Sequence, residues 1–99
     1  MCTYDTTRLT VRGSGKAPGG WFALAEASVY FDHPVHAPAD HSLNIDLMDP
    51  ARGPQWRVAV ELDPESARAL AAAIVATLDA APPALVARGA VSAAGAEAG

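Results

Sequence analysis

The three histidines of the chain, His33, His36 and His41, lie within one nine-residue stretch. Imidazole is the commonest metal-binding side chain, and three imidazoles can hold an ion that keeps one coordination position open. Pro34 and Pro38 restrict the backbone of this stretch, so the loop is stiffer than its length implies. The histidine spacing matches no single metal signature. The stretch therefore predicts either a metal site or a surface loop whose histidines only make hydrogen bonds.

Cys2 is the only cysteine, which excludes an internal disulfide. It is a candidate fourth ligand, and a thiolate beside imidazoles favours Zn²⁺, Fe or Cu over Mg²⁺ or Ca²⁺. If Met1 is removed, the cysteine can chelate a metal through its amine and thiol, or act as a nucleophile. The alternative is an inert thiol at a frayed terminus. Asp32, at the start of the histidine loop, is a candidate to orient a histidine.

A second candidate region is a polar face formed by alternating segments. Its side chains are carboxylates, an amide, a phenol and a guanidinium, at Glu26, Tyr30, Asn44, Asp46, Arg57 and Glu61. Such a face can bind a small polar molecule. Glu26 or Asp46 could act as a general base if a second layer buried it and raised its pKa. The alternative is a solvated face with cross-strand ion pairs.

The elements that position these residues follow from hydrophobic periodicity. Four runs alternate with period two, which predicts an antiparallel sheet with one covered face. These runs are residues 4–12, 21–31, 42–47 and 56–62. The glycine-rich segment GSGKAPGG at 13–20 joins the first two runs and is predicted as a flexible hairpin loop. It lacks the spacing of a phosphate-binding loop, so we do not expect it to bind phosphate. Asp49 and Pro50 predict a turn before the last strand.

Residues 63–81 predict a helix with Asp63 as N-cap and Pro64 at the first helical position. Ala67, Leu70, Ala71, Ile74, Leu78 and Ala81 form an apolar stripe. The helix is expected to pack on one face of the sheet. The order β-β-β-β-α then gives a single α+β domain over residues 1–81. The alanine-, glycine- and proline-rich residues 82–99 are expected to be a disordered tail.

Composition limits the class of partner. Seven basic and eleven acidic residues give a net charge of −4, and the basic residues are scattered, which argues against nucleic acid. No apolar run approaches about 18 residues, so no membrane span is expected. The start lacks a hydrophobic signal segment, which favours a cytoplasmic location. Alanine supplies 23 residues, so the core is small, and a helix that is apolar on two sides suggests a homodimer, whose interface would be either the second helix face or the open sheet face.

Several stretches resemble a small actinobacterial family of uncharacterised proteins with a domain of unknown function. They are the opening MCTY, the GSGK segment, and the run VYFDHPVHAP followed by HSLNID. The resemblance covers roughly residues 1–81 and leaves the tail outside it. It implies a stand-alone protein of one domain, and it implies no activity.

Three hypotheses about function remain open. The first is a small metal-dependent protein or enzyme acting on a small molecule, which uses His33, His36 and His41 with Cys2 or Asp32. The second is a cofactor-free enzyme or small-molecule binder built on the polar face. The third is a non-catalytic dimeric interaction or accessory module.

Overall fold

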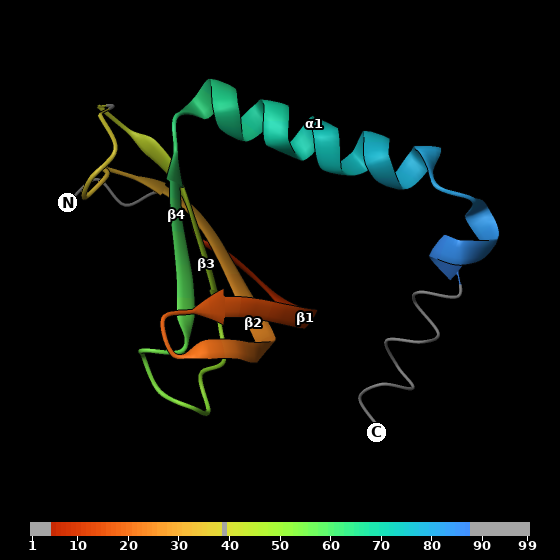
Figure 1. Ribbon diagram of the computed structural model, residues 1–99. Coiled ribbons are helices and arrows are strands. Elements are labelled where there is room, and N and C mark those ends of the chain that lie inside the picture. The colour runs from red at the N-terminus through yellow and green to blue at the C-terminus, as the bar shows by residue number, and fades with distance from the viewer. Residues whose placement is uncertain (1–4, 39, 88–99) are drawn as a thin grey trace. The chain divides into compact units, whose positions relative to one another are not determined.

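In the computed structural model, which describes residues 5–38 and 40–87, four strands form one antiparallel sheet and a helix follows them (Figure 1). The strands lie in the sheet in chain order, so each strand pairs with its neighbours in sequence. The elements are β1 (Thr7–Ala17), β2 (Gly20–Asp32), β3 (Ser42–Met48), β4 (Arg57–Leu62) and α1 (Pro64–Ala80). The predicted α+β class, with four antiparallel strands before one helix, is confirmed.

The prediction that residues 13–20 form a flexible loop is wrong, because the pairing of β1 with β2 continues through them. The last pair joins Ala17 to Gly20, so the turn is short. Gly20 has a φ of 121°, a backbone conformation that glycine adopts at little cost. The pairing register shifts between Thr10 and Gly13, as it does where a β-bulge bends a strand.

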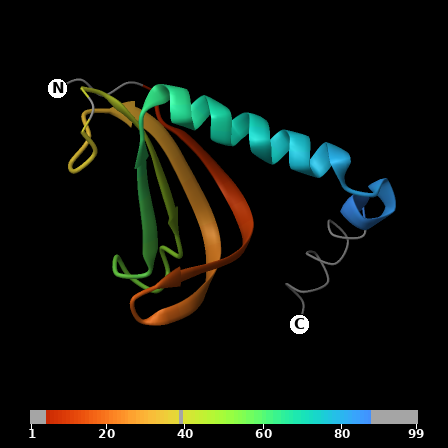
Figure 2. The same cartoon turned by 45° about the horizontal axis from the view of Figure 1, so that its top comes forward.

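The sheet is strongly curved, as Figure 2 shows, and β1 comes close to β4 at one end. A Cβ atom on Gly15 of β1 would lie 3.2 Å from Leu24 Cδ2 and 3.3 Å from Val58 Cγ2 of β4. Phe22 is 3% exposed, and its ring centroid lies 5.5 Å from that of Trp56. The missing side chain at Gly15 therefore allows an apolar cluster to close at this end of the sheet.

One face of the sheet carries polar side chains, as the alternation predicts. Tyr30 pairs with Asn44, and Asn44 pairs with Glu61. The sequence left open whether this face is solvated or covered; Ser42, Asn44 and Asp46 are buried, at 0%, 6% and 9% exposed, and Asp46 forms a cross-strand ion pair with Arg57. The loop between β2 and β3 folds back toward this face and shelters it. The apolar side chains of β3, on the other face, are only partly buried.

Helix α1 begins as predicted. The Asp63 carboxylate accepts a 2.6 Å hydrogen bond from the backbone N–H of Ser66, which satisfies one free donor of the first turn. This bond is the main reason that the pKa of Asp63 lies below its usual range. Pro64 is the first helical residue, and the helix ends at Ala80, before the two prolines. No residue of the helix is buried.

The chain divides into two compact units, residues 1–66 with the sheet and residues 67–99 with most of α1. The packing of α1 on the sheet therefore stays a prediction. So does the disordered tail over residues 82–99. Residues 83–87 form one more helical turn, and residues 88–99 lie outside the described part of the chain. Among the described residues, no helix has the length and apolar character needed to cross a bilayer.

Candidate functional site

The loop between β2 and β3 is fastened to β4 by the side chain of Glu61. Its Oε2 accepts a 2.5 Å hydrogen bond from the N–H of Val35, and its Oε1 accepts bonds of 2.9 Å from His36 and 3.0 Å from Ala37. These bonds stabilise the charged carboxylate. They hold the pKa of Glu61 below its usual range, with the Val35 bond as the largest cause. The path of the histidine loop is therefore fixed by a residue of the last strand.

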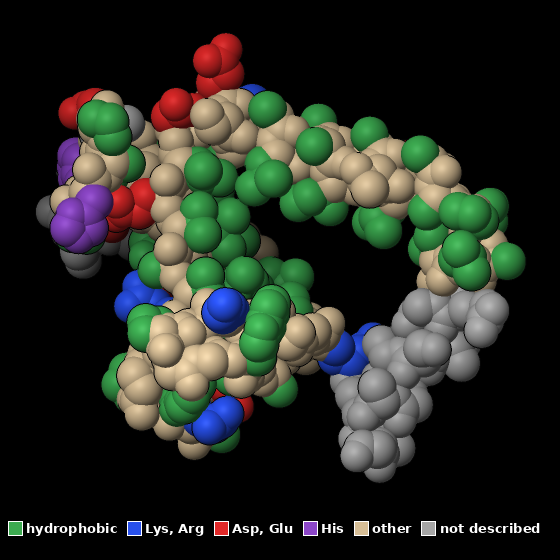
Figure 3. Space-filling model, in the orientation of Figure 1, with side chains coloured by type: hydrophobic (Ala, Val, Ile, Leu, Met, Phe, Trp, Pro, Cys, Tyr) green, Lys and Arg blue, Asp and Glu red, His purple; other side chains and the backbone are tan. Residues whose placement is uncertain are grey.

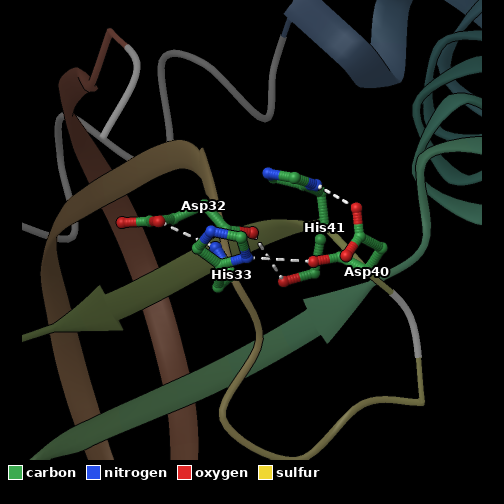
Figure 4. Close-up of polar contacts among 5 residues, drawn as sticks. Asp32, His33, Asp40 and His41 are labelled. Atoms are coloured by element: carbon green, nitrogen blue, oxygen red, sulfur yellow. Dashed lines mark hydrogen bonds and ion pairs between the residues drawn. The ribbon is translucent and has the colours of Figure 1, made fainter. Parts of the chain in front are cut away.

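Two of the three histidines meet around Asp40 (Figure 4). His33 Nδ1 lies 3.1 Å from the backbone oxygen of Asp40, and His41 Nδ1 lies 2.9 Å from Asp40 Oδ2. The two ring centroids are 4.4 Å apart, and the His41 ring also stacks on Phe31 at 5.5 Å. One possible ligand atom from each of His33, Asp40 and His41 lies within 4.8 Å of the others.

The partners of the two rings determine which ring nitrogen carries the hydrogen. A backbone carbonyl and an ionised carboxylate only accept hydrogen bonds, so Nδ1 donates in both His33 and His41. A neutral imidazole with its hydrogen on Nδ1 has a free lone pair on Nε2. Figure 4 shows both rings turning Nδ1 toward Asp40 and the other nitrogen away from it. Metal-binding histidines are commonly oriented by such a carbonyl or carboxylate.

The remaining predicted ligands lie elsewhere. His36 is outside the group, and its backbone N–H is bound to Glu61. Asp32 accepts a 2.7 Å hydrogen bond from the backbone N–H of His33, so that bond reaches the main chain of the histidine and not its ring. Cys2 lies outside the described residues. The metal-binding roles of His36 and Cys2 therefore stay predictions.

Two residues that organise the loop were missed by reasoning from sequence. Asp40 stands beside His41 in the chain, and a carboxylate next to an imidazole is a weak local signal for an orienting pair. Glu61 offers no local signal, because the loop residues that it binds are 24 to 26 positions away. Glu61 was expected only as one member of the polar face.

On the polar face, Asp46 holds Tyr30 and Arg57 together. Arg57 donates from both Nε and Nη2 to Asp46 Oδ1 at 2.8 Å, and the Tyr30 hydroxyl donates to Oδ2 at 3.2 Å. Burial, followed by the charge of Asp46, raises the pKa of Tyr30, so the hydroxyl keeps its hydrogen at neutral pH. Asp46 is thus already engaged with two donors, which weakens its candidacy as a general base.

A hollow of about 920 Å³ lies between this polar face and the histidine loop. Its walls include Tyr30, Asn44 and Arg57 from the strands, and His33 and His36 from the loop. In Figure 3, histidine and acidic side chains gather on the side of the sheet where this loop lies. A second hollow of about 430 Å³ adjoins the first, because Tyr30 and two carboxylates line both. Glu26 lines only the second hollow.

A four-stranded antiparallel sheet with a polar hollow, followed by a helix, defines this protein as a small α+β domain with a candidate binding face. The chain belongs to a family described as "Family of unknown function (DUF6295)", whose model matches residues 1–87. This match confirms membership of an uncharacterised family, while the actinobacterial origin stays a prediction. No curated protein and no solved structure matches the chain.

Proposed function

We propose that this protein binds a transition-metal ion through Nε2 of His33 and Nε2 of His41, with Asp40 orienting both rings. One observation carries the proposal: Asp40 engages Nδ1 of each ring as a hydrogen-bond acceptor. With its hydrogen on Nδ1, each neutral imidazole carries its lone pair on Nε2, and the two ring centroids are 4.4 Å apart. Rings held in this way lose less freedom when an ion binds, which favours binding.

The ligand types decide the class of ion. Imidazole nitrogen suits zinc, copper and iron, whereas Mg²⁺ and Ca²⁺ prefer sites made of oxygen atoms alone. Two imidazoles leave coordination positions for water or a small molecule. His33 also lines the larger hollow, so an ion at this site would lie next to a space for a small molecule. This position supports the further proposal of a metal-dependent enzyme.

The experiment is a titration of the purified, untagged chain with Zn²⁺, followed by calorimetry, and with Co²⁺, followed by its absorption spectrum. We expect one ion per chain. His33→Ala and His41→Ala should each weaken affinity by more than tenfold, and Asp40→Ala should weaken it by about 10–100-fold, because it removes the side-chain acceptor that orients the His41 ring. Affinity should also fall in acid, because protons compete with the metal for the imidazole nitrogens.

His36→Ala is the matched control, because His36 is in the same loop but outside the group. It should bind Zn²⁺ as the wild type does. Circular dichroism should show that all four variants keep the fold. Equal affinities in the wild type and in the His33→Ala/His41→Ala double variant would contradict the proposal. Equal losses at all three histidines would instead restore the three-histidine site expected from the sequence.

A further inference from the structure

The polar face of the sheet holds buried side chains whose hydrogen-bonding capacity is unused. Asn44 is 6% exposed and lines the larger hollow. Its Oδ1 accepts a 2.6 Å bond from the Ser42 hydroxyl, and its amide nitrogen has no partner among the described residues. No polar side-chain atom of the described residues is fully enclosed without a partner, so this nitrogen reaches the hollow. This nitrogen can therefore donate a hydrogen bond to water or to a ligand in the hollow.

Ser28 repeats this pattern in the second hollow. It is 7% exposed, it lines the hollow of about 430 Å³, and its hydroxyl has no hydrogen-bond partner among the described residues. Ser28 pairs with Asp46 across β2 and β3, and Tyr30 pairs with Asn44 one step along the same face. The Asn44 amide and the Ser28 hydroxyl therefore lie close together on neighbouring strands. Tyr30 and Asp46, which line both hollows, lie beside them.

Two carboxylates of this face, Asp46 and Glu61, already have hydrogen-bond partners within the protein. Arg57 donates two hydrogen bonds to Asp46, and three backbone N–H groups donate to Glu61. A cation is disfavoured, because Asp46 and Glu61 already accept hydrogen bonds and the positive charge of Arg57 lies nearby. An anion would meet the negative charges of Asp32, Asp46 and Glu61 around the same hollow. Each of these carboxylates still has lone pairs that accept hydrogen bonds, so the face favours a neutral ligand that both donates and accepts.

We propose that this face binds a small neutral molecule with adjacent hydroxyl groups, the chemistry of a monosaccharide. Each hydroxyl of such a molecule can accept a hydrogen bond from the Asn44 amide or the outer edge of Arg57. The same hydroxyl can donate to a carboxylate or to Ser28. These side chains bind a neutral polyol without the desolvation cost that an extra buried charge would add. The site does not depend on the metal proposed above.

The test is a titration of the ¹⁵N-labelled full chain, kept in a metal chelator, by two-dimensional NMR. The neutral probes are D-glucose and D-ribose, and the charged probes are succinate and 1,4-diaminobutane. We expect saturable shifts around Ser28, Asn44 and Arg57 with at least one neutral probe, and none there with the charged probes. Asn44→Ala should raise the Kd at least tenfold, because it removes the buried donor.

Ser28→Ala is the second variant, because it removes a hydroxyl that has no partner among the described residues and so should leave the fold intact. It should raise the Kd several-fold, while Ser14→Ala, an exposed serine of β1 outside both hollows, should not change it. The proposal is overturned if neither neutral probe gives saturable shifts up to its solubility. It is also overturned if a charged probe binds more tightly, or if both variants leave the Kd unchanged.

Discussion

Two carboxylates, the exposed Asp40 and the partly buried Glu61, give the histidine loop its shape. Asp40 bonds to His33 through its main-chain oxygen and to His41 through its side chain. Glu61 accepts hydrogen bonds from the backbone N–H groups of three successive residues. Both acids act as acceptors, and the ionised form of a carboxylate is acceptor-only. The order of the loop therefore depends on Glu61 remaining charged.

Glu61→Gln should loosen this loop. The amide oxygen can still accept hydrogen bonds, but the new NH₂ group places a donor against N–H groups that need an acceptor. We expect lower amide hydrogen-exchange protection at Val35, His36 and Ala37, together with weaker Zn²⁺ binding. Glu65→Gln, in the first turn of α1, is the control and should change neither quantity. Unchanged protection at these three amides in Glu61→Gln would contradict the anchoring role.

The lowered pKa of Glu61 also sets the sign of a pH dependence. The contribution of Glu61 is fully present above the pKa of an unfolded glutamate, about 4.3, and is lost as the pH falls through the lower folded value. Protection of the three amides in the wild type should therefore decline only below about pH 4. In Glu61→Gln it should be low throughout and insensitive to this range.

These contacts explain which features of the candidate site the sequence could predict and which it could not. The sequence placed three histidines in one loop and six polar residues on one face, because both are local patterns. It could not tell which two histidines converge, since that depends on the backbone path that Glu61 imposes from another strand. For the same reason it could not tell that Asn44 and Asp46 are buried.

In β1, the alternation of apolar and polar residues predicts only the first half of the strand. The order and type of the strands and the start of α1 were predicted, because period-two patterns, an N-cap and a proline are all local signals. The glycine-rich second half of β1 was predicted as a loop, because glycine has no side chain to alternate. Its role as a strand depends on Leu24 and Val58, which lie in two other strands.

Gly15→Val should destabilise the sheet. Its Cβ would already lie 3.2 Å from Leu24 Cδ2 and 3.3 Å from Val58 Cγ2, and valine adds two methyl groups to that contact. Overpacking of this kind costs about 1–3 kcal/mol, which urea unfolding would measure as a lower midpoint. Gly13→Val is the matched control, because nothing lies within 4 Å of its Cβ position. Equal midpoints for the two variants would show that the contact is unimportant.

At the scale of the whole molecule, few large apolar side chains are buried. Phe22 is 3% exposed, whereas Leu70, Ile74 and Leu78 of α1 are 43%, 53% and 54% exposed. A helix of this length is only marginally stable in water without packing. A symmetric homodimer would cover these side chains. We therefore propose the apolar stripe of α1 as the contact surface, in place of the second helix face or the open sheet face expected from the sequence, so that the stripe packs on a second copy and not on its own sheet.

Light scattering should then give twice the 10.2 kDa mass of one chain, with dissociation on dilution. Ile74→Glu should shift the equilibrium toward the monomer, because it places a charge in the apolar contact. Ala72→Glu, on the opposite side of the helix by its 3.6-residue period, should leave the mass unchanged. A monomer mass at every concentration would remove the dimer.

The bonds between Glu61 and residues 35–37 also order the events of biosynthesis. Translation runs from the N-terminus, so both histidines of the candidate site are synthesised before the last strand. A nascent chain that stops short of Glu61 carries both imidazoles but not the carboxylate that fixes the loop. Completion of the sheet and assembly of the candidate site are therefore one event, which takes place when the final strand is added.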